Sequence, residues 1–346
     1  YYNGVIEQVA GGIGNVEHNS ILVRYSNDFS IWDLESVNHY KDQTDIFFTC
    51  HEFSYNKIAE AYEPYLGLIR QMFHKYCSGT LEEFMEECDV YKLQRPVFES
   101  YFEKGFCERT EQILIDEVEY EQERMHSSIV TMLQKLSEIC PIVIVLNRFQ
   151  LASKSTMQLT NRLLQTKNKN IGIVLGVNDV QSIPEFAHEE WDAICESMDD
   201  RNMVYHIGNA GRNMEPDVMD YYSDYESDDG YRILNNLVYF LDFDQANHHL
   251  SKIERRIKFD NFTISEKKHY QLLLLQIMVS VLQRDIAKAL ESCEDLEKLQ
   301  DQEKEGAFYY NFWMATSYMY LGKLEEAMIY VQKAKECGEA LGDDFL

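Results

Sequence analysis

The sequence predicts a two-part fold, in which an α/β domain with a mostly parallel sheet precedes an all-α array of helical repeats. In the first half of the chain, short apolar segments such as residues 142–146 and 171–177 alternate with helical stretches. Such segments are typical of parallel strands buried on both faces. From residue 231 onward, related helical segments recur about every 40 residues, a period typical of stacked helix pairs.

The first elements are two strands and two helices. Ser20–Tyr25 and Ile46–Cys50 are apolar runs bounded by polar residues, and each is predicted to form a strand. Asp28–Asn38 is predicted to form the helix between them. The second helix, Tyr62–Phe73, has Pro64 near its start, where a missing N–H costs little.

A helical insertion separates these elements from a second pair of strands. Residues 81–139 show helical periodicity almost throughout. The strand at residues 142–146, a helix over Ser155–Leu164 and the strand at residues 171–177 then complete the α/β pattern. We therefore expect an α/β domain over residues 1–180, with its helical insertion at residues 81–139.

The rest of the chain divides into a linker and the repeats. Residues 181–230 lose periodicity and contain an acidic run, Asp217–Asp229, which predicts a linker with an exposed loop. Residues 231–346 are predicted to form three helix pairs, and the end of the chain at Phe345-Leu346 lacks a polar cap, which predicts that the array is truncated. Small residues that let paired helices approach recur at Ala246, Ala289 and Ala327.

The strand at residues 142–146 runs directly into Asn147-Arg148-Phe149-Gln150, which is the shape of an NTPase Walker B segment. With Cys50-His51-Glu52 at an earlier strand end and Ser155-Thr156 opening a helix, this segment resembles the signal-transduction NTPases of the STAND class. The resemblance implies an AAA-like P-loop NTPase fold. It also implies a large bacterial regulator in which such a module is joined to tetratricopeptide (TPR) repeats.

The last helix pair resembles a TPR repeat. The small, aromatic, turn, small and small positions of that motif are occupied by Ala315, Tyr318, Gly322, Ala327 and Ala334. In the two preceding pairs the turn position holds Leu241 and Arg284 instead of glycine. The resemblance implies a TPR-like solenoid at the C-terminal end of the chain.

The residues that would carry nucleotide chemistry depart from the family pattern. A P-loop needs a Lys for the phosphates and a hydroxyl for Mg²⁺, whereas the glycine cluster offers only Gly12, Gly14 and Asn15. A second candidate loop, residues 25–32, has no glycine, and a flexible turn is the alternative interpretation of the cluster.

The carboxylate that the Walker B position requires is also missing. The first strand of the central pair ends in the neutral Asn147, and the second ends in Asn178, which can only hydrogen-bond. We therefore expect no ATP hydrolysis and no obligatory cofactor, while binding of ATP or ADP without turnover stays open. The alternative is an active switch whose Walker A motif is divergent or lies elsewhere, with Glu52 as a substitute Mg²⁺ ligand.

The repeats supply a second candidate site. Apolar side chains at the positions that line the concave surface of a TPR superhelix predict a groove for a protein or peptide partner. These side chains are Leu274, Met278, Tyr309, Phe312 and Met319. The alternative is that a following repeat buries them.

Composition excludes several classes of function. The 59 acidic residues outnumber the 32 basic ones, for a net charge of −27, so nucleic-acid binding is not expected. No apolar run approaches the ~20 residues that span a bilayer, and eight cysteines without a CxxC pair indicate reduced thiols in a cytoplasmic protein. No metal site is expected, because His51-Glu52 lacks a second histidine and the adjacent His248 and His249 point to different faces.

These observations predict a non-catalytic regulatory or scaffolding segment of a cytoplasmic signalling or transcription-control protein. Its partners would be a protein or peptide in the repeat groove and an output domain of its own outside this chain, which begins without methionine at Tyr1. A nucleotide-sensing ATPase switch and a pure interaction module are the two alternatives.

Overall fold

The computed structural model describes the following residues: 2–14, 19–25, 35–41, 45–54, 57–107, 118–166, 168–178, 183–199, 204–207, 228–259 and 263–342. The chain divides into two compact units. The first comprises Tyr1–Ile113 and Glu119–Tyr221, and the second comprises Leu114–Val118 and Tyr222–Leu346.

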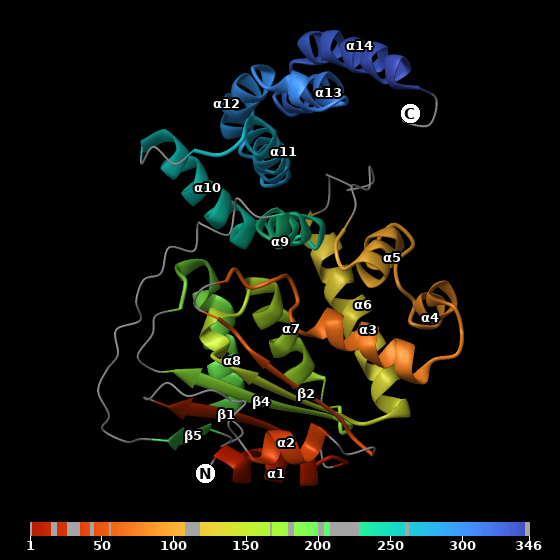
Figure 1. Cartoon of the computed structure of the whole chain (residues 1–346), viewed down its shortest axis with the longest axis vertical. Helices are drawn as coiled ribbons and strands as arrows, with labels where there is room; N and C mark the ends of the chain where they lie inside the picture. Colours follow the sequence, from red (N-terminus) through yellow and green to blue (C-terminus); the bar gives the residue numbers. More distant parts are fainter. Residues whose placement is uncertain are drawn as a thin grey trace. The chain divides into compact units, whose positions relative to one another are not determined.

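The first unit is built on a five-stranded parallel sheet with the order β2-β3-β4-β1-β5 (Figure 1). Its strands are β1 (Ser20–Tyr25), β2 (Phe47–Glu52), β3 (Ile142–Asn147), β4 (Ile171–Asn178) and β5 (Val204–Ile207). Every residue of β3 and β4 is buried, which explains their uninterrupted apolar sequences. The predicted α/β class with a parallel sheet is thus confirmed.

Helices cover both faces of this sheet. One face carries α1 (Tyr2–Gly11) and α2 (Glu35–Lys41) (Figure 1). The other carries α3 (Tyr65–Tyr76), α6 (Val118–Ile139), α7 (Lys154–Gln165) and α8 (His188–Asp199). The two short helices α4 (Leu81–Glu87) and α5 (Arg95–Lys104) pack against each other, and α5 packs against α3. The predicted helical insertion corresponds to α4, α5 and α6. Connections between parallel strands are right-handed, so the direction in which a connection moves along the sheet decides which face its helix covers. The connection from β1 to β2 moves in one direction, and those from β2 to β3, β3 to β4 and β4 to β5 move in the other, so both faces are covered.

Two glycines of β4 let α1 lie close to the sheet. A Cβ atom at Gly172 would come 2.7 Å from Val9 Cγ1, and a Cβ atom at Gly176 would meet the Tyr2 hydroxyl. Gly172 and Gly176 are four residues apart on one strand, so they share a face of the sheet. Val9 and Tyr2 lie near opposite ends of α1, so glycine is needed at both points of contact.

The structure corrects the prediction of a linker over residues 181–230. This segment contributes α8 and the edge strand β5 to the first unit, and β5 pairs with β1 from Leu22↔Val204 to Tyr25↔Ile207. The α8 sequence is rich in acidic residues, and only Trp191, Ile194 and Met198 are buried, so its apolar pattern is weak. The first 11 residues of the acidic run, 217–227, lie outside the described residues.

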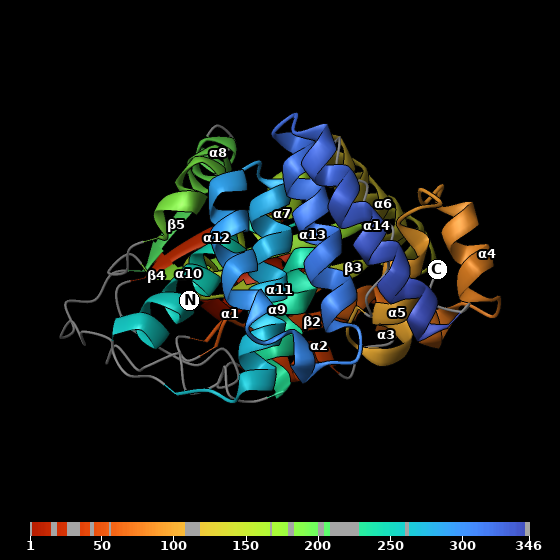
Figure 2. The ribbon, with the colours of Figure 1, turned by 90° about the horizontal axis from the view of Figure 1, so that it is seen from above.

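The described residues of the second unit form three helical hairpins. They pair α9 (Asp228–Tyr239) with α10 (Phe243–Phe259), α11 (Glu266–Leu282) with α12 (Ile286–Glu297), and α13 (Gly306–Tyr320) with α14 (Leu324–Leu341). Figure 2 shows α13 and α14 running side by side, as does Figure 1.

The three hairpins share one turn geometry. Leu241, Arg284 and Gly322 all adopt left-handed φ values, of 65°, 62° and 71°. In each hairpin the next backbone N–H donates to the carbonyl five residues earlier, at 2.8 Å from Asp242, 2.8 Å from Asp285 and 3.0 Å from Lys323. This is the hydrogen bond of a Schellman motif, and it occurs at the turn positions that the sequence repeat predicts.

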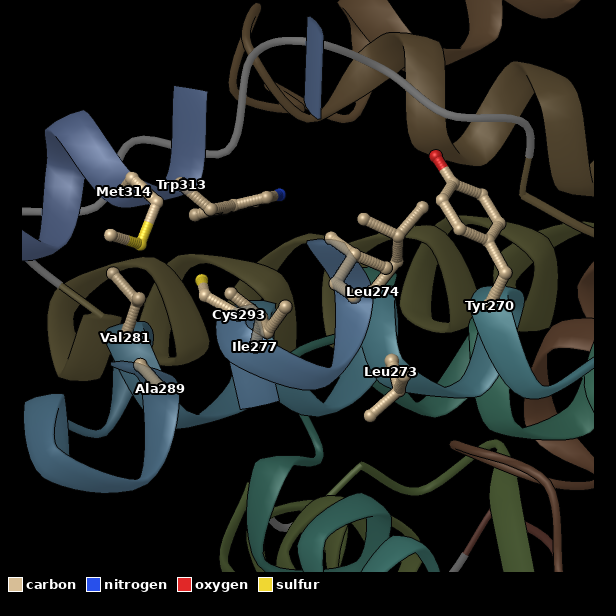
Figure 3. Close-up of a cluster of buried hydrophobic side chains, with 10 residues drawn as sticks. Tyr270, Leu273, Leu274, Ile277, Val281, Ala289, Cys293, Trp313 and Met314 are labelled. Atoms are coloured by element: carbon tan, nitrogen blue, oxygen red, sulfur yellow. The ribbon is translucent and has the colours of Figure 1, made fainter. Parts of the chain in front are cut away.

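The second and third hairpins are joined by a continuous apolar core, part of which is shown in Figure 3. Trp313 and Met314 of α13 reach toward Ile277 and Val281 of α11 and toward Cys293 of α12. The third hairpin therefore covers the second by inserting large side chains of its first helix.

Candidate functional site at the carboxyl edge of the sheet

The strand order places a topological switch at the carboxyl edge of the sheet. β1 and β4 are neighbours, yet the chain leaves them toward opposite faces. In open α/β sheets, ligands bind in the crevice outside the strand ends at such a switch. Tyr25 and Asn178 end these two strands, and Asn147 ends β3 next to β4, so these three residues define the candidate site.

Asn147 is buried at the centre of this edge. Its Oδ1 atom accepts a hydrogen bond of 2.8 Å from the Tyr25 hydroxyl. Tyr2 lies beside it, because both side chains approach the space that Gly176 leaves open. Burial raises the pKa of Tyr2 well above its ordinary value, with further contributions from Tyr25, Cys50 and Glu52, so Tyr2 stays a neutral phenol.

An ion pair occupies the next position along the edge. Arg148 adopts a left-handed backbone conformation after β3, and its guanidinium lies 2.9 Å from Glu52 Oε1 at the end of β2. Glu52, the substitute Mg²⁺ ligand considered from the sequence, therefore forms an ion pair with Arg148.

Asn178 is held through its backbone. Its N–H donates to Gln150 Oε1 at 3.2 Å, and Gln150 is itself buried in the 3₁₀ turn Phe149–Leu151 that follows β3. Sequence reasoning did not single out Gln150, although it lies inside the Walker-B-like segment. A buried polar residue directly after a parallel strand is the signal that could have identified it.

Hydroxyl groups at the start of α7 are also engaged. Ser153 caps the helix by accepting from the Thr156 N–H at 3.2 Å. The Thr156 hydroxyl donates to the Glu63 carbonyl at 3.0 Å, and Ser155 Oγ accepts from the Tyr62 N–H at 3.2 Å. The Ser155 and Thr156 hydroxyls, which could have held a metal or phosphate, thus fix the end of the segment between β2 and α3 instead.

His51 is the titratable ring of the site. Its Nε2 atom lies 3.4 Å from Glu63 Oε1. Burial lowers the pKa of His51 to about 4, although Glu60 and Glu52 act in the opposite direction. The contact with Glu63 is therefore one between a neutral imidazole and a carboxylate at neutral pH, and not an ion pair.

The glycine candidates lie at the opposite edge of the sheet. Gly12 and Gly14 follow α1 and precede β1, and the Gly14 N–H donates to the carbonyl of Lys169, just before β4, at 2.7 Å. The structure therefore does not bring Gly12 and Gly14 together with Asn147 and Asn178. Asn15 and most of the second candidate loop, residues 26–32, lie outside the described residues.

The predicted groove residues divide between core and surface. Leu274 belongs to the buried core of the hairpins, which corrects its placement in an open groove, whereas Met278 and Tyr309 pack against that core half-buried. Phe312 and Met319 are exposed, with 38% and 51% of their surfaces accessible.

No family model, curated protein or solved structure matches this chain. Over the described ranges, no group of three or more histidine, cysteine or acidic side chains is placed to hold a metal ion. No described helix has the length and apolarity needed to cross a bilayer.

Proposed function

We propose that this chain is a non-catalytic regulatory or scaffolding segment, in which a P-loop-NTPase-like α/β unit accompanies TPR-like hairpins that bind a protein partner. The partner would present an apolar helix to the last hairpin. The observation that carries this proposal is an exposed apolar stripe on α14, formed by Leu324, Met328 and Val331.

The internal repeat indicates what covers this stripe. Met328 and Val331 correspond to Leu290 and Cys293 of α12, 38 positions earlier, as judged from Ala327 and Ala289 at the same hairpin position. Cys293 is completely buried, and Leu290 packs against the core cluster that includes Trp313 and Met314 of α13. By contrast, 64% of Met328 and 47% of Val331 are accessible. The stripe therefore matches a helix with large apolar side chains, as α13 has.

The experiment uses α13 itself as the probe. We expect a synthetic peptide of residues 306–320, with lysines appended for solubility, to bind the whole chain saturably. Met328→Glu and Val331→Glu should abolish binding, because each buries a carboxylate in an apolar contact. Lys333→Glu, which changes an exposed residue of the same helix, is the control. Binding that is absent, or equal in all four proteins, would refute the proposed surface.

The non-catalytic assignment rests on the chemistry of the carboxyl edge. The described strands β1 to β4 end in a tyrosine, an internally paired Glu52 and two amides, and none supplies a free carboxylate for Mg²⁺. We expect no phosphate release from Mg-ATP. A nucleotide that prefers the native state must raise the unfolding midpoint, so midpoints with and without Mg-ATP and Mg-ADP test binding separately.

A nucleotide-responsive switch is the second candidate, and the topological switch between β1 and β4 favours it. In that case, Mg-ATP and Mg-ADP would shift the unfolding midpoint by different amounts. Phosphate release would additionally identify an active ATPase and overturn the non-catalytic assignment.

A further inference from the structure

The exposed large apolar side chains of the described residues are concentrated on the last hairpin. Ten such side chains are exposed over the described ranges, and seven of them lie between residues 312 and 331. These seven are Phe312, Met319, Leu321, Leu324, Met328, Ile329 and Val331. Single exposed apolar side chains are ordinary, whereas a concentration on one element marks an interaction site.

The internal repeat places exposed side chains of α13 on the same face as the stripe of α14. The offset of 38 positions that relates α14 to α12 also relates α13 to α11, since the left-handed turn residues of the two hairpins differ by it. With this offset, Phe312 corresponds to Leu274 and Met319 corresponds to Val281. Leu274 and Val281 are buried in the core between the second and third hairpins (Figure 3), whereas 38% of Phe312 and 51% of Met319 are accessible. The last hairpin therefore exposes, on both of its helices, the face that the second hairpin buries beneath the third.

The last hairpin carries almost none of the excess charge of the chain. Residues 306–342 contain three basic and four acidic side chains, for a net charge of −1, whereas the whole chain carries −27. Two copies that met through strongly acidic surfaces would repel each other, but two last hairpins would meet without that cost. A second copy of this chain, which presents the same apolar face, is therefore a partner that fits this surface in both polarity and charge.

The stripe on α14 is complementary to itself when two such helices run antiparallel. Leu324, Met328, Val331 and Lys335 follow one another at intervals of four, three and four residues, so they share one face of the helix. When Met328 lies opposite Val331 of a second copy, Leu324 lies opposite Lys335. The Lys335 ammonium then reaches Glu325 of the second copy, and this ion pair occurs twice by symmetry.

Lys335 can exchange its present partner at little cost. Its ammonium lies 3.7 Å from Glu339 Oε1 one turn further along α14, and more than half of each side chain is exposed. Such a pair contributes little to stability. A parallel arrangement would instead place Lys335 beside Lys335 of the second copy, so the charges favour the antiparallel one.

We propose that this face of the last hairpin joins two copies of the chain into a two-fold symmetric dimer. The two α14 helices run antiparallel, with Met328 of each copy packed on Val331 of the other. Phe312 and Met319 of α13 extend the contact. The inference rests on the proposed function, because it names the partner of the same apolar surface.

Sedimentation velocity of the whole chain over a series of concentrations tests the proposal. We expect a dimer whose fraction rises with concentration. Met328→Glu should leave the chain monomeric, because the dimer would bury two carboxylates in an apolar contact. Ile329→Glu is the matched control, since this neighbouring apolar residue is 56% exposed but lies off the face that contains Leu324, Met328 and Val331, and its dimer should persist.

A charge exchange tests the antiparallel arrangement. Glu325→Lys alone and Lys335→Glu alone should each weaken dimerisation severalfold, because like charges then face each other across the contact. An equal mixture of the two variants should regain it as a heterodimer, since each copy supplies the charge that the other lacks. Two single variants that dimerise as wild type, or a mixture without recovery, would overturn the antiparallel pairing.

The remaining outcomes separate this inference from the proposed function. A chain that stays monomeric but binds the peptide of residues 306–320 would overturn the dimer and leave the partner-binding surface standing. A dimer that Met328→Glu abolishes, together with no binding of the peptide, would support the dimer and refute the α13-like partner. A dimer that persists in Met328→Glu would place the contact elsewhere and overturn the inference.

Discussion

Burial lowers the pKa of His51 and His126 to about 4 and that of His249 to about 3, from an ordinary value of 6.5. These imidazoles are neutral in the native protein and take up protons when the chain unfolds. Below pH 6.5 the unfolded state therefore binds more protons than the native state. The resulting stability is complete above pH 6.5 and is lost as the pH falls toward 4.

For His126 we expect a loss of up to about 3 kcal/mol over this window, and His126→Gln should remove that part of the pH dependence. Denaturant unfolding at a series of pH values measures the slope. His74→Gln, a change at an exposed histidine, is the control and should behave as wild type. Equal slopes in all three proteins would show that His126 is not held neutral by the fold.

Gly176 of β4 is a position at which the packing leaves no room for a side chain. A Cβ atom there would meet the Tyr2 hydroxyl and lie 2.7 Å from Asn147 Oδ1. We expect Gly176→Ala to lower the free energy of unfolding by about 2 kcal/mol, because both neighbours belong to buried elements. Gly4→Ala is the control, since a Cβ atom at Gly4 meets nothing within 4 Å.

A double variant distinguishes this contact from a general effect of the strand. Tyr2→Phe removes the hydroxyl that the new methyl group would meet, so it should recover part of the loss in Gly176→Ala. Strict additivity of the two changes would instead assign the loss to Asn147 or to the backbone.

At the scale of elements, the three turns of the hairpins offer a comparison of residue types in one geometry. Arg284 pays for its left-handed conformation, whereas Gly322 does not. We expect Arg284→Gly to raise the free energy of unfolding by about 0.5 kcal/mol, offset in part by loss of the guanidinium contact with the Tyr320 ring. Gly322→Ala should lower it by about 1 kcal/mol.

Urea unfolding of both variants checks the sign of each change. Gly67→Ala in the first turn of α3, where the added Cβ meets nothing within 4 Å, is the matched glycine control and should stabilise the chain slightly. Stabilisation by Gly322→Ala would contradict the shared turn geometry.

Strands and hairpins were predictable where one physical signal dominated. β1, β3 and β4 are continuous apolar runs, and the alanine repeat marked all three hairpins. β5 was missed because it has only four residues, and α8 because acidic side chains dilute its apolar face. Both are fixed by tertiary pairing with elements far away in the sequence.

The candidate sites were less predictable for a related reason. Asn147 and Asn178 follow directly from strand ends, but Gly12 and Gly14 required knowledge of which sheet edge they occupy. A polar pocket between α6, α7 and α8 combines His126 with Gln158, Asn161 and Glu190 of two other helices. On each helix alone these residues resemble an ordinary solvated face, so only the packing of three helices reveals the pocket.

At the scale of the whole molecule, the dominant feature is a net charge of −27, from 59 acidic and 32 basic residues. Excess charge of one sign destabilises a compact state by self-repulsion, although it keeps the protein soluble. Ion pairs such as Lys258–Glu254 and Lys298–Asp295 are exposed, so they contribute little against this term. Ionic strength should therefore act mainly through the net repulsion.

We expect the unfolding midpoint to rise as NaCl increases from low concentration to ~0.15 M, where the Debye length falls to about 8 Å. The physical reason is that like charges repel over distances comparable to the Debye length, whereas the partners of an ion pair are only a few ångströms apart. Salt therefore weakens the repulsion more than the attraction within ion pairs. Scanning calorimetry in NaCl, with an equal osmolality of sucrose as the control, separates screening from solute exclusion. A midpoint that falls with NaCl would mean that the local ion pairs outweigh the excess charge, and the acidic surface would then have to be regarded as structurally compensated.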